Sequence, residues 1–166
     1  MLVITHVRTQ ADADAIRAIV PMYFDWMRAR YPDNAANIDS YITAQDIDGQ
    51  MRNLLTLFAP PSADCLLARL DGAPVGMVMT KPHSPGTCEM NRMFVTDAAR
   101  GLGVGKALVA EIMATAKALG YNRMVLSAGP LHTAALAIYR NVGFTPDATL
   151  PDTGAGDVEV RMAVDL

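Results

Sequence analysis

The chain has 166 residues, of which 51% are hydrophobic and 19% are charged, as expected for one globular domain. A net charge of −3 and the lack of a basic run exclude a general attraction to nucleic acid or to an anionic membrane, so we expect neither partner. Residues 1–6 lack the charged start of a signal peptide, and no window approaches the roughly 20 apolar residues of a membrane span. These features predict a cytoplasmic protein.

The metal-ligating and redox-active residue types are sparse. Two cysteines, Cys65 and Cys88, form no CxxC pair, so disulfides are not expected to organise the fold. The three histidines are scattered along the chain, whereas a zinc site needs clustered ligands. We therefore expect no metal.

The first part of the chain is predicted to be mainly helical. Residues 2–7 are rich in β-branched side chains and predict a short strand. Apolar residues at i, i+3 and i+4 spacing predict a helix over 11–30, which Pro21 should kink or split in two. An acidic loop over 33–46 and a second amphipathic helix over roughly 43–57 are expected to follow.

The remaining part of the chain alternates between strands and helices. Strands are predicted at 64–70, 74–81, 87–96, 122–127 and 157–165, and helices at about 104–119 and 132–142. The resulting order, β-α-α-β-β-β-α-β-α-β, predicts a single α/β (α+β) domain. Its mixed central sheet should have about six to seven strands, flanked by about four helices.

A glycine-rich segment, Arg-Gly-Leu-Gly-Val-Gly-Lys-Ala at 100–107, separates a predicted strand from a predicted helix. Free amides and the dipole at a helix N-terminus bind anions, and two basic residues add positive charge here. A P-loop is excluded because three residues, and not four, separate Gly101 from Gly105, and Ala107 cannot bind a metal. The dinucleotide fingerprint is excluded because Lys106 takes the place of its third glycine. A tight turn that only packs a helix onto a sheet remains the alternative.

Three motifs in the same order carry a family resemblance. The spacing Arg-x-x-Gly-x-Gly (Arg100, Gly103 and Gly105) resembles the acyl-CoA pyrophosphate loop of the GNAT acetyltransferase superfamily. Upstream, the segment at 89–95 (Glu-Met-Asn-Arg-Met-Phe-Val) is similar to the family's fourth strand. Downstream, 134–144 is similar to its Ala-x-x-Leu-Tyr-x-x-x-Gly-Phe helix. Together the motifs cover about 64–145.

The resemblance implies a single acetyltransferase domain over 1–166, with acetyl-CoA as co-substrate and an amine as acceptor. It places the CoA-binding core at about 64–145 and the acceptor-side helices at about 9–58. The implied CoA-binding residues are the pyrophosphate loop, the backbone of a splayed strand edge and one tyrosine: Arg100, Gly101, Leu102, Gly103, Val104, Gly105, Lys106, Ala107, Met93, Phe94, Val95 and Tyr139. Many relatives form dimers, so a homodimer is one expectation.

Two residues match catalytic positions of the family. Glu89 lies at the position of a general base, which would act directly or through water. The alternative is a carboxylate in solvent or in an ion pair, for which Arg92 is one candidate. Tyr139 matches the tyrosine that protonates the departing thiolate; packing beside Ile138 and Val142 is its alternative role.

This sequence departs from the family pattern at two positions. The asparagine that often follows the fifth strand is replaced by Ser-Ala-Gly-Pro at 127–130, so its contact to the pantetheine arm is lost or passes to Ser127. Asn91 replaces a frequent lysine, which removes a charge near the acceptor side. His132 is expected to be an exposed loop residue, with a second acid–base role as the alternative.

The acceptor and the existence of turnover stay open at this point. In this fold the first helices shape the acceptor pocket, and the candidates are Tyr23, Asp25, Trp26, Arg28 and Tyr31, together with the acidic residues Asp33, Asp39, Asp46 and Asp48. The sequence does not distinguish a small amine from an amino acid or a protein amine. A non-catalytic acyl-CoA sensor, or a phosphate-binding domain without CoA, are the remaining readings.

Overall fold

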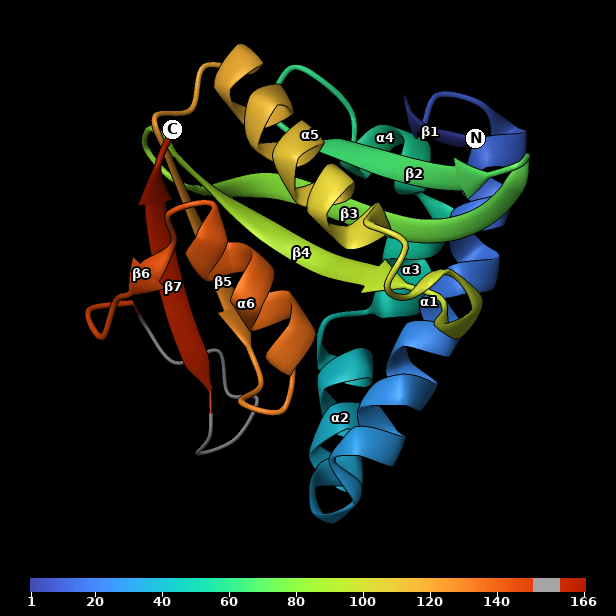
Figure 1. Cartoon of the computed structure of the whole chain (residues 1–166), viewed down its shortest axis with the longest axis horizontal. Helices are drawn as coiled ribbons and strands as arrows, with labels where there is room; N and C mark the ends of the chain where they lie inside the picture. Colours follow the sequence, from blue (N-terminus) through green and yellow to red (C-terminus); the bar gives the residue numbers. More distant parts are fainter. Residues whose placement is uncertain (151–158) are drawn as a thin grey trace.

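A computed structural model describes residues 1–150 and 159–166 and shows a seven-stranded sheet in the order β1-β2-β3-β4-β5-β7-β6 (Figure 1). All neighbouring strands are antiparallel except β4 and β5, which are parallel. The sheet is therefore mixed, as predicted. The strands are β1 (Leu2–His6), β2 (Asp64–Leu70), β3 (Ala73–Ser84), β4 (Thr87–Val95), β5 (Arg123–Ala128), β6 (Thr145–Pro146) and β7 (Val160–Asp165).

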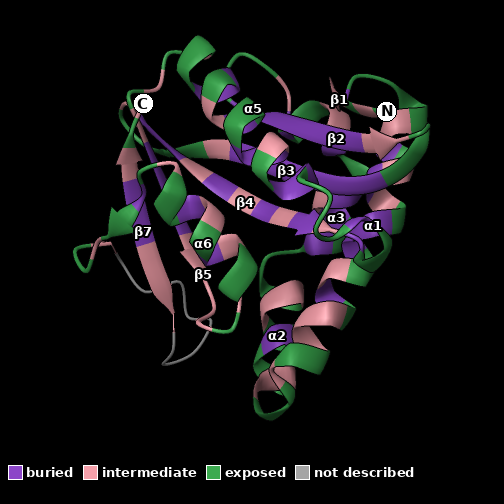
Figure 2. Ribbon diagram, in the orientation of Figure 1, coloured by how far each residue is buried: buried purple, intermediate pink, exposed green. Residues whose placement is uncertain are grey.

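Helices cover both faces of the sheet and bury one apolar cluster on each (Figures 1 and 2). Helices α5 (Val104–Ala118) and α6 (Thr133–Asn141) pack on one face, where Leu108, Ile112 and Leu136 are buried. Helices α1 (Gln10–Arg30), α2 (Ala35–Ala44), α3 (Ile47–Arg52) and α4 (Leu54–Leu57) cover the other face. Among the described helices, none is long and apolar enough to cross a membrane.

A kink or a split was predicted at Pro21; helix α1 is one continuous helix, so the split does not occur. The helix begins with a capping box, in which Thr9 and Asp12 satisfy each other's backbone amides. Pro21 removes one amide donor, a loss of about 3 kcal/mol in a helix interior, but it lies on the exposed side of α1. Burial of the opposite face, including Ile16 and Phe24, offsets this loss.

The segment predicted as an acidic loop and one helix is instead three short helices, α2, α3 and α4. The loop prediction for 33–46 was wrong because α2 occupies most of it. Asp46 separates α2 from α3: its φ is 46°, in the left-handed region, and its side chain accepts a hydrogen bond from the Gly49 amide. The apolar face predicted for 43–57 is nevertheless buried, as Ile47 and Leu54 show.

Three strands differ from the prediction by more than one residue. Strand β3 runs on to Ser84 and includes Pro82, which was predicted to lie in the turn. The two-residue strand β6 was missed because so short a segment carries no period. The last predicted strand, 157–165, is confirmed as β7 from residue 160, while 157 and 158 lie outside the described residues.

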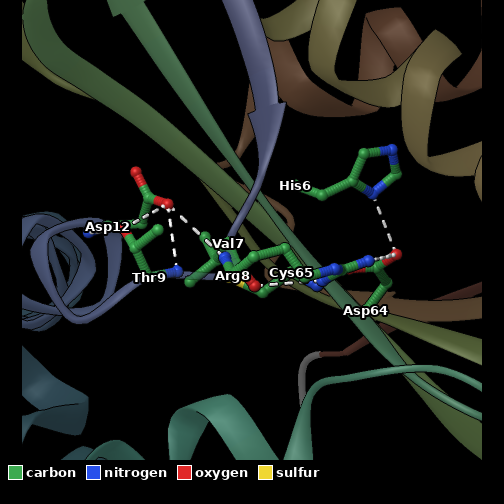
Figure 3. A network of polar contacts seen from close by, with 7 residues as sticks. All are labelled: His6, Val7, Arg8, Thr9, Asp12, Asp64 and Cys65. Atoms are coloured by element: carbon green, nitrogen blue, oxygen red, sulfur yellow. Dashed lines mark hydrogen bonds and ion pairs between the residues drawn. The ribbon is translucent and has the colours of Figure 1, made fainter.

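A polar network fastens the first strand to the sheet (Figure 3). Asp64, 1% exposed at the start of β2, accepts two hydrogen bonds from the Arg8 guanidinium at 2.7 and 2.8 Å. Its carboxylate also accepts the Cys65 amide at 2.8 Å and lies 2.9 Å from Nδ1 of His6. Burial opposes ionisation, but these donors prevail and lower the Asp64 pKa.

Candidate active site

Strands β4 and β5 diverge and leave a gap in the middle of the sheet (Figure 1). They pair only from Thr87 to Glu89 on β4, opposite Arg123 to Val125 on β5. Strand β4 then continues to Val95, and on that side no strand of the described residues pairs with it. Backbone donors and acceptors along this edge, which includes Met93, are therefore available to an extended ligand.

The glycine loop lies between β4 and α5, as predicted. Gly101 and Gly103 have φ values of 78° and 80°, which favour glycine, and a Cβ on either would meet nothing within 4 Å. Gly103 is the N-cap of α5 and no side chain caps this end, so the first helical amides keep their donors. Val104 and Gly105 are buried, whereas Lys106 is exposed. The loop thus combines open space, amide donors and a positive charge.

A cavity of about 760 Å³ lies between α1, α2, the outer half of β4 and the end of β5. Glu89, Met93 and Tyr139 all line it, so the structure brings both predicted catalytic side chains to one space. The glycine loop is not part of its lining. The cavity and the loop therefore form two separate parts of the site.

Glu89 projects from β4 and its side chain is 23% exposed. Asn91 Nδ2 donates a 3.0 Å hydrogen bond to Glu89 Oε1. Nζ of Lys81, on the neighbouring strand β3, lies 3.9 Å from Oε2. The ionic partner of Glu89 is therefore Lys81 and not Arg92, and Glu89 lines the cavity while it keeps these contacts.

Tyr139, on α6, is only 6% exposed and lines the cavity from the other side of the gap. Its ring packs at a tilt against Phe144, with centroids 5.8 Å apart. Both predicted roles of this residue are thus compatible, because the ring packs in the core while the residue reaches the cavity. Burial raises the Tyr139 pKa, so the phenol keeps its proton at neutral pH.

Comparison with known proteins identifies the family. A family model described as the acetyltransferase (GNAT) family matches residues 20–144. The chain belongs to this family. An uncharacterized N-acetyltransferase of Schizosaccharomyces pombe is 36% identical over 105 residues, which cover 62% of this chain and 64% of that protein. An uncharacterized N-acetyltransferase of Escherichia coli is 29% identical over 72% of this chain and 74% of its own length.

A solved N-acetyltransferase structure confirms the fold. The PaiA N-acetyltransferase of Thermoplasma acidophilum, in complex with coenzyme A, superimposes with a TM-score of 0.72. The match covers 100% of this chain and 99% of that one at 15% identity, so it is evidence for the fold alone. The fold predicted from the three motifs, a GNAT-like α/β domain with a mixed sheet, is confirmed.

The described residues fit acetyl-CoA, the acetyl donor used in the GNAT family. The start of α5 offers unpaired amides to a pyrophosphate, and space is open around Gly101 and Gly103. At Gly105, a Cβ would lie 3.1 Å from Cδ1 of Ile138, so glycine lets α5 approach α6 closely beside the gap. The unpaired edge of β4 suits the amide groups of a pantetheine arm.

Arg100 is turned toward α1. Its Nη1 lies 2.7 Å from Asp97, its Nε donates to the Val95 carbonyl at 3.3 Å, and its guanidinium lies over the rings of Trp26 and Phe94. It is thus anchored beside the loop by an acidic partner and two aromatic faces. Its contact with a pyrophosphate stays a prediction.

The predicted acceptor residues divide into cavity and surface groups. Tyr23 and Tyr31 line the cavity, and so does Asp33. The remaining candidates are not part of the cavity lining. Trp26 packs edge-on against His132, with ring centroids 4.8 Å apart, and Arg28 forms ion pairs with Asp25 and Asp39. Asp46 is the N-cap of α3, and Asp48 lies in the first turn of that helix. The acidic residues therefore do not form one cation-binding loop.

His132 was predicted to be exposed, and this was wrong. It lines the cavity, and its Nδ1 lies 2.6 Å from the Tyr31 hydroxyl, which also accepts the Leu131 amide at 2.9 Å. Burial lowers the His132 pKa to about 4, so the imidazole is neutral at pH 7. This contact joins the end of α1 to the loop after β5 across the cavity.

Two further polar residues of the cavity were not singled out as site residues from the sequence. Asn91 and Arg92 both line it, and each has a buried atom without a hydrogen-bond partner among residues 1–150 and 159–166: Asn91 Oδ1 and Arg92 Nε. The segment at 89–95 pointed to this strand. The burial of Arg92 depends on a distortion of β4 that no periodic pattern predicts.

Proposed function

We propose that the protein is an N-acetyltransferase that transfers the acetyl group of acetyl-CoA to a primary amine by direct attack in a ternary complex. One observation carries the proposal: Glu89 and Tyr139 line the same cavity beside the β4–β5 gap. Glu89 lies on strand β4 and Tyr139 on helix α6. Residues 64–145 would bind the CoA, and the helices within 9–58 would form the acceptor side.

The chain's backbone would hold the donor. Amides at 101–107 would bind the pyrophosphate, with Arg100 and Lys106 adding positive charge. The unpaired edge at Met93, Phe94 and Val95 would bind the pantetheine arm, and one of its amides would donate to the thioester oxygen as negative charge develops there. When bound, acetyl-CoA supplies the electrophilic carbonyl carbon.

Glu89 would remove the proton that blocks attack. An acceptor ammonium with a pKa of about 10.4 must lose a proton before its nitrogen has a free electron pair. The Glu89 carboxylate takes that proton, directly or through a water, and Asn91 holds the carboxylate in position through its 3.0 Å hydrogen bond.

Tyr139 would assist the departing sulfur. The C–S bond breaks as the new C–N bond forms, and the Tyr139 hydroxyl donates its hydrogen to the thiolate. The second proton that leaves the acceptor nitrogen, as the amide forms, restores the Tyr139 hydroxyl. The phenol pKa lies above that of a thiol, about 8.5, so donation accompanies bond breaking and does not precede it. Tyr139 therefore enters the reaction protonated.

The proposal is tested by following CoA thiol release from acetyl-CoA across a panel of amines, with the acetylated product identified by mass spectrometry. We expect release to depend on one class of amine, and Tyr139→Phe to lower kcat about 10–100-fold while acetyl-CoA binding is retained. Acetyl-CoA binding without acetylation of any amine would overturn the enzymatic proposal and favour a sensor.

A further inference from the structure

Arg92 is a buried cation in the wall of the cavity. The residue is only 8% exposed, and it lies where β4 bulges: Met77 and Met79 of β3 pair with Phe94 and Asn91, so two residues of β4 oppose Val78 alone. The φ of Arg92 is 49°, an unusual conformation for a non-glycine residue. The bulge places Arg92 on the same side of the sheet as α3 and α4.

The partners of the Arg92 guanidinium are all uncharged. Nη2 donates to Gln50 Oε1 at 2.9 Å, Nη1 lies 3.6 Å from Sδ of Met79, and the group lies 5.9 Å from the centre of the Phe58 ring. Nε has no partner. Within 1–150 and 159–166, Arg92 forms no ion pair: Glu89 interacts with Lys81 and Asn91 instead, and the other two acids of the cavity lining are Asp33 and Glu159.

A buried guanidinium without a counter-ion is unfavourable unless a ligand supplies the negative charge. Its planar donors match a carboxylate, which can accept two parallel hydrogen bonds. The neighbouring residue, Asn91, also lines the cavity and offers the opposite polarity, because its buried Oδ1 has no hydrogen-bond donor among the described residues. The hydrogen bond from Asn91 Nδ2 to Glu89 fixes which atom of the amide is the free acceptor.

We infer that the acceptor is an amino acid with a free carboxylate, an inference that rests on the proposed acetyl transfer. The carboxylate binds the Arg92 guanidinium, which lines the cavity and has no ion-pair partner among the described residues. The ammonium lies toward Asn91 and Glu89, where it loses its proton. Arg92 is thus the specificity-determining residue of the acceptor site.

The first experiment compares matched acceptors with the wild-type protein. CoA release is measured with the twenty standard amino acids, and then with the α-carboxamide and the decarboxylated amine of the best of them. We expect kcat/KM for both derivatives to be at least about 100-fold lower, since a site built around a polar group rejects analogues that lack it. Derivatives within threefold of the parent amino acid would overturn the inference and leave acetyl transfer intact.

The second experiment separates recognition from a structural role. Arg92→Lys keeps a charge but loses Nε and the planar donor pattern. Its control is Arg17→Lys, because Arg17 Nε also anchors α3, through the Met51 carbonyl at 2.8 Å, and Arg17 does not line the cavity. We expect Arg92→Lys to raise KM for the amino acid at least tenfold and to change KM for the carboxamide less than threefold. If Arg92→Lys raises KM equally for the amino acid and the carboxamide, Arg92 is structural only and the inference is overturned. Arg17→Lys should leave the ratio of these two KM values unchanged.

Failure of the two proposals can be distinguished. If no amine is acetylated, the proposed function fails, and carboxylate recognition is then read by calorimetry with N-acetyl amino acids added to the protein saturated with CoA. Binding that Arg92→Lys weakens at least tenfold supports the inference, and lack of binding by the wild type overturns it. If Arg92→Lys does not fold, the inference is decided by the wild-type protein, from the ratio of kcat/KM for the amino acid to kcat/KM for its carboxamide.

Discussion

Replacing Asp64 with asparagine tests the network that ties β1 to the sheet. The substitution keeps the size of the side chain but removes the charge that holds Arg8 at 2.7 and 2.8 Å. Hydrogen bonds to a charged group contribute about 1.5–3 kcal/mol each. The Arg8 side chain is 41% exposed and is hydrated again in the variant, which reduces the cost. We therefore expect the free energy of unfolding to fall by about 2–3 kcal/mol in total. For a chain of this size, that lowers Tm by about 4–12 °C.

The pH dependence follows from the direction of the Asp64 pKa shift. The folded-state pKa is lowered, so the stabilisation is fully present above the unfolded pKa of about 3.9 and is lost as the pH falls through the folded value. We follow urea unfolding by circular dichroism. The free energy of unfolding should differ between wild type and Asp64→Asn by a constant amount from pH 8 to 5, and this difference should shrink below about pH 4. Asp14→Asn, which breaks an exposed pair with Arg17, is the control and should change stability by less than about 1 kcal/mol. The reasoning is refuted if Asp64→Asn lowers the free energy of unfolding by less than about 0.5 kcal/mol. It is also refuted if the difference in free energy does not shrink in acid.

Three further predictions concern the site. Glu89→Gln should lower kcat about 10²–10⁴-fold if Glu89 is the base, with acetyl-CoA affinity unchanged by calorimetry; an unchanged kcat would remove it from the mechanism. His132 should titrate near pH 4 by nuclear magnetic resonance, because burial disfavours its charged form, and a midpoint near 6.5 would show an exposed ring. Tyr31→Phe removes the hydroxyl that contacts His132 and the Leu131 amide, and should lower stability by about 1–2 kcal/mol in urea unfolding; a stability equal to wild type would show that this contact does not hold the loop.

Most of the fold was predictable because burial and periodicity agree along the chain. The face of α5 predicted to be inward is buried, and β2 and β3 alternate between the two apolar clusters. The exceptions depend on single residues whose conformation is set by their surroundings. Asp46 adopts a left-handed conformation and divides a helix, while Pro21 is tolerated on an exposed face.

The candidate site was predictable only where it rests on local sequence. The glycine loop and the strand at 89–95 carry their own patterns, so Glu89 could be placed in advance. The position of His132 depends on Tyr31, about a hundred residues earlier in the chain, and no local pattern encodes that contact. The burial of Arg92 results from a bulge in β4, which shifts the side chain out of the alternation that strand prediction assumes.

The most direct test of the account is the binding of acetyl-CoA at the glycine loop, measured by calorimetry. Gly103→Trp fills the open space at the start of α5, and Gly120→Trp is the matched control at the other end of that helix. Both glycines have left-handed φ values, 80° and 96°, and neither has an atom within 4 Å of a built Cβ. The account predicts that the wild type and Gly120→Trp bind acetyl-CoA alike, while Gly103→Trp binds at least about 30-fold more weakly, a difference of about 2 kcal/mol. Equal binding by Gly103→Trp, or no binding by the wild type at millimolar acetyl-CoA, would contradict it.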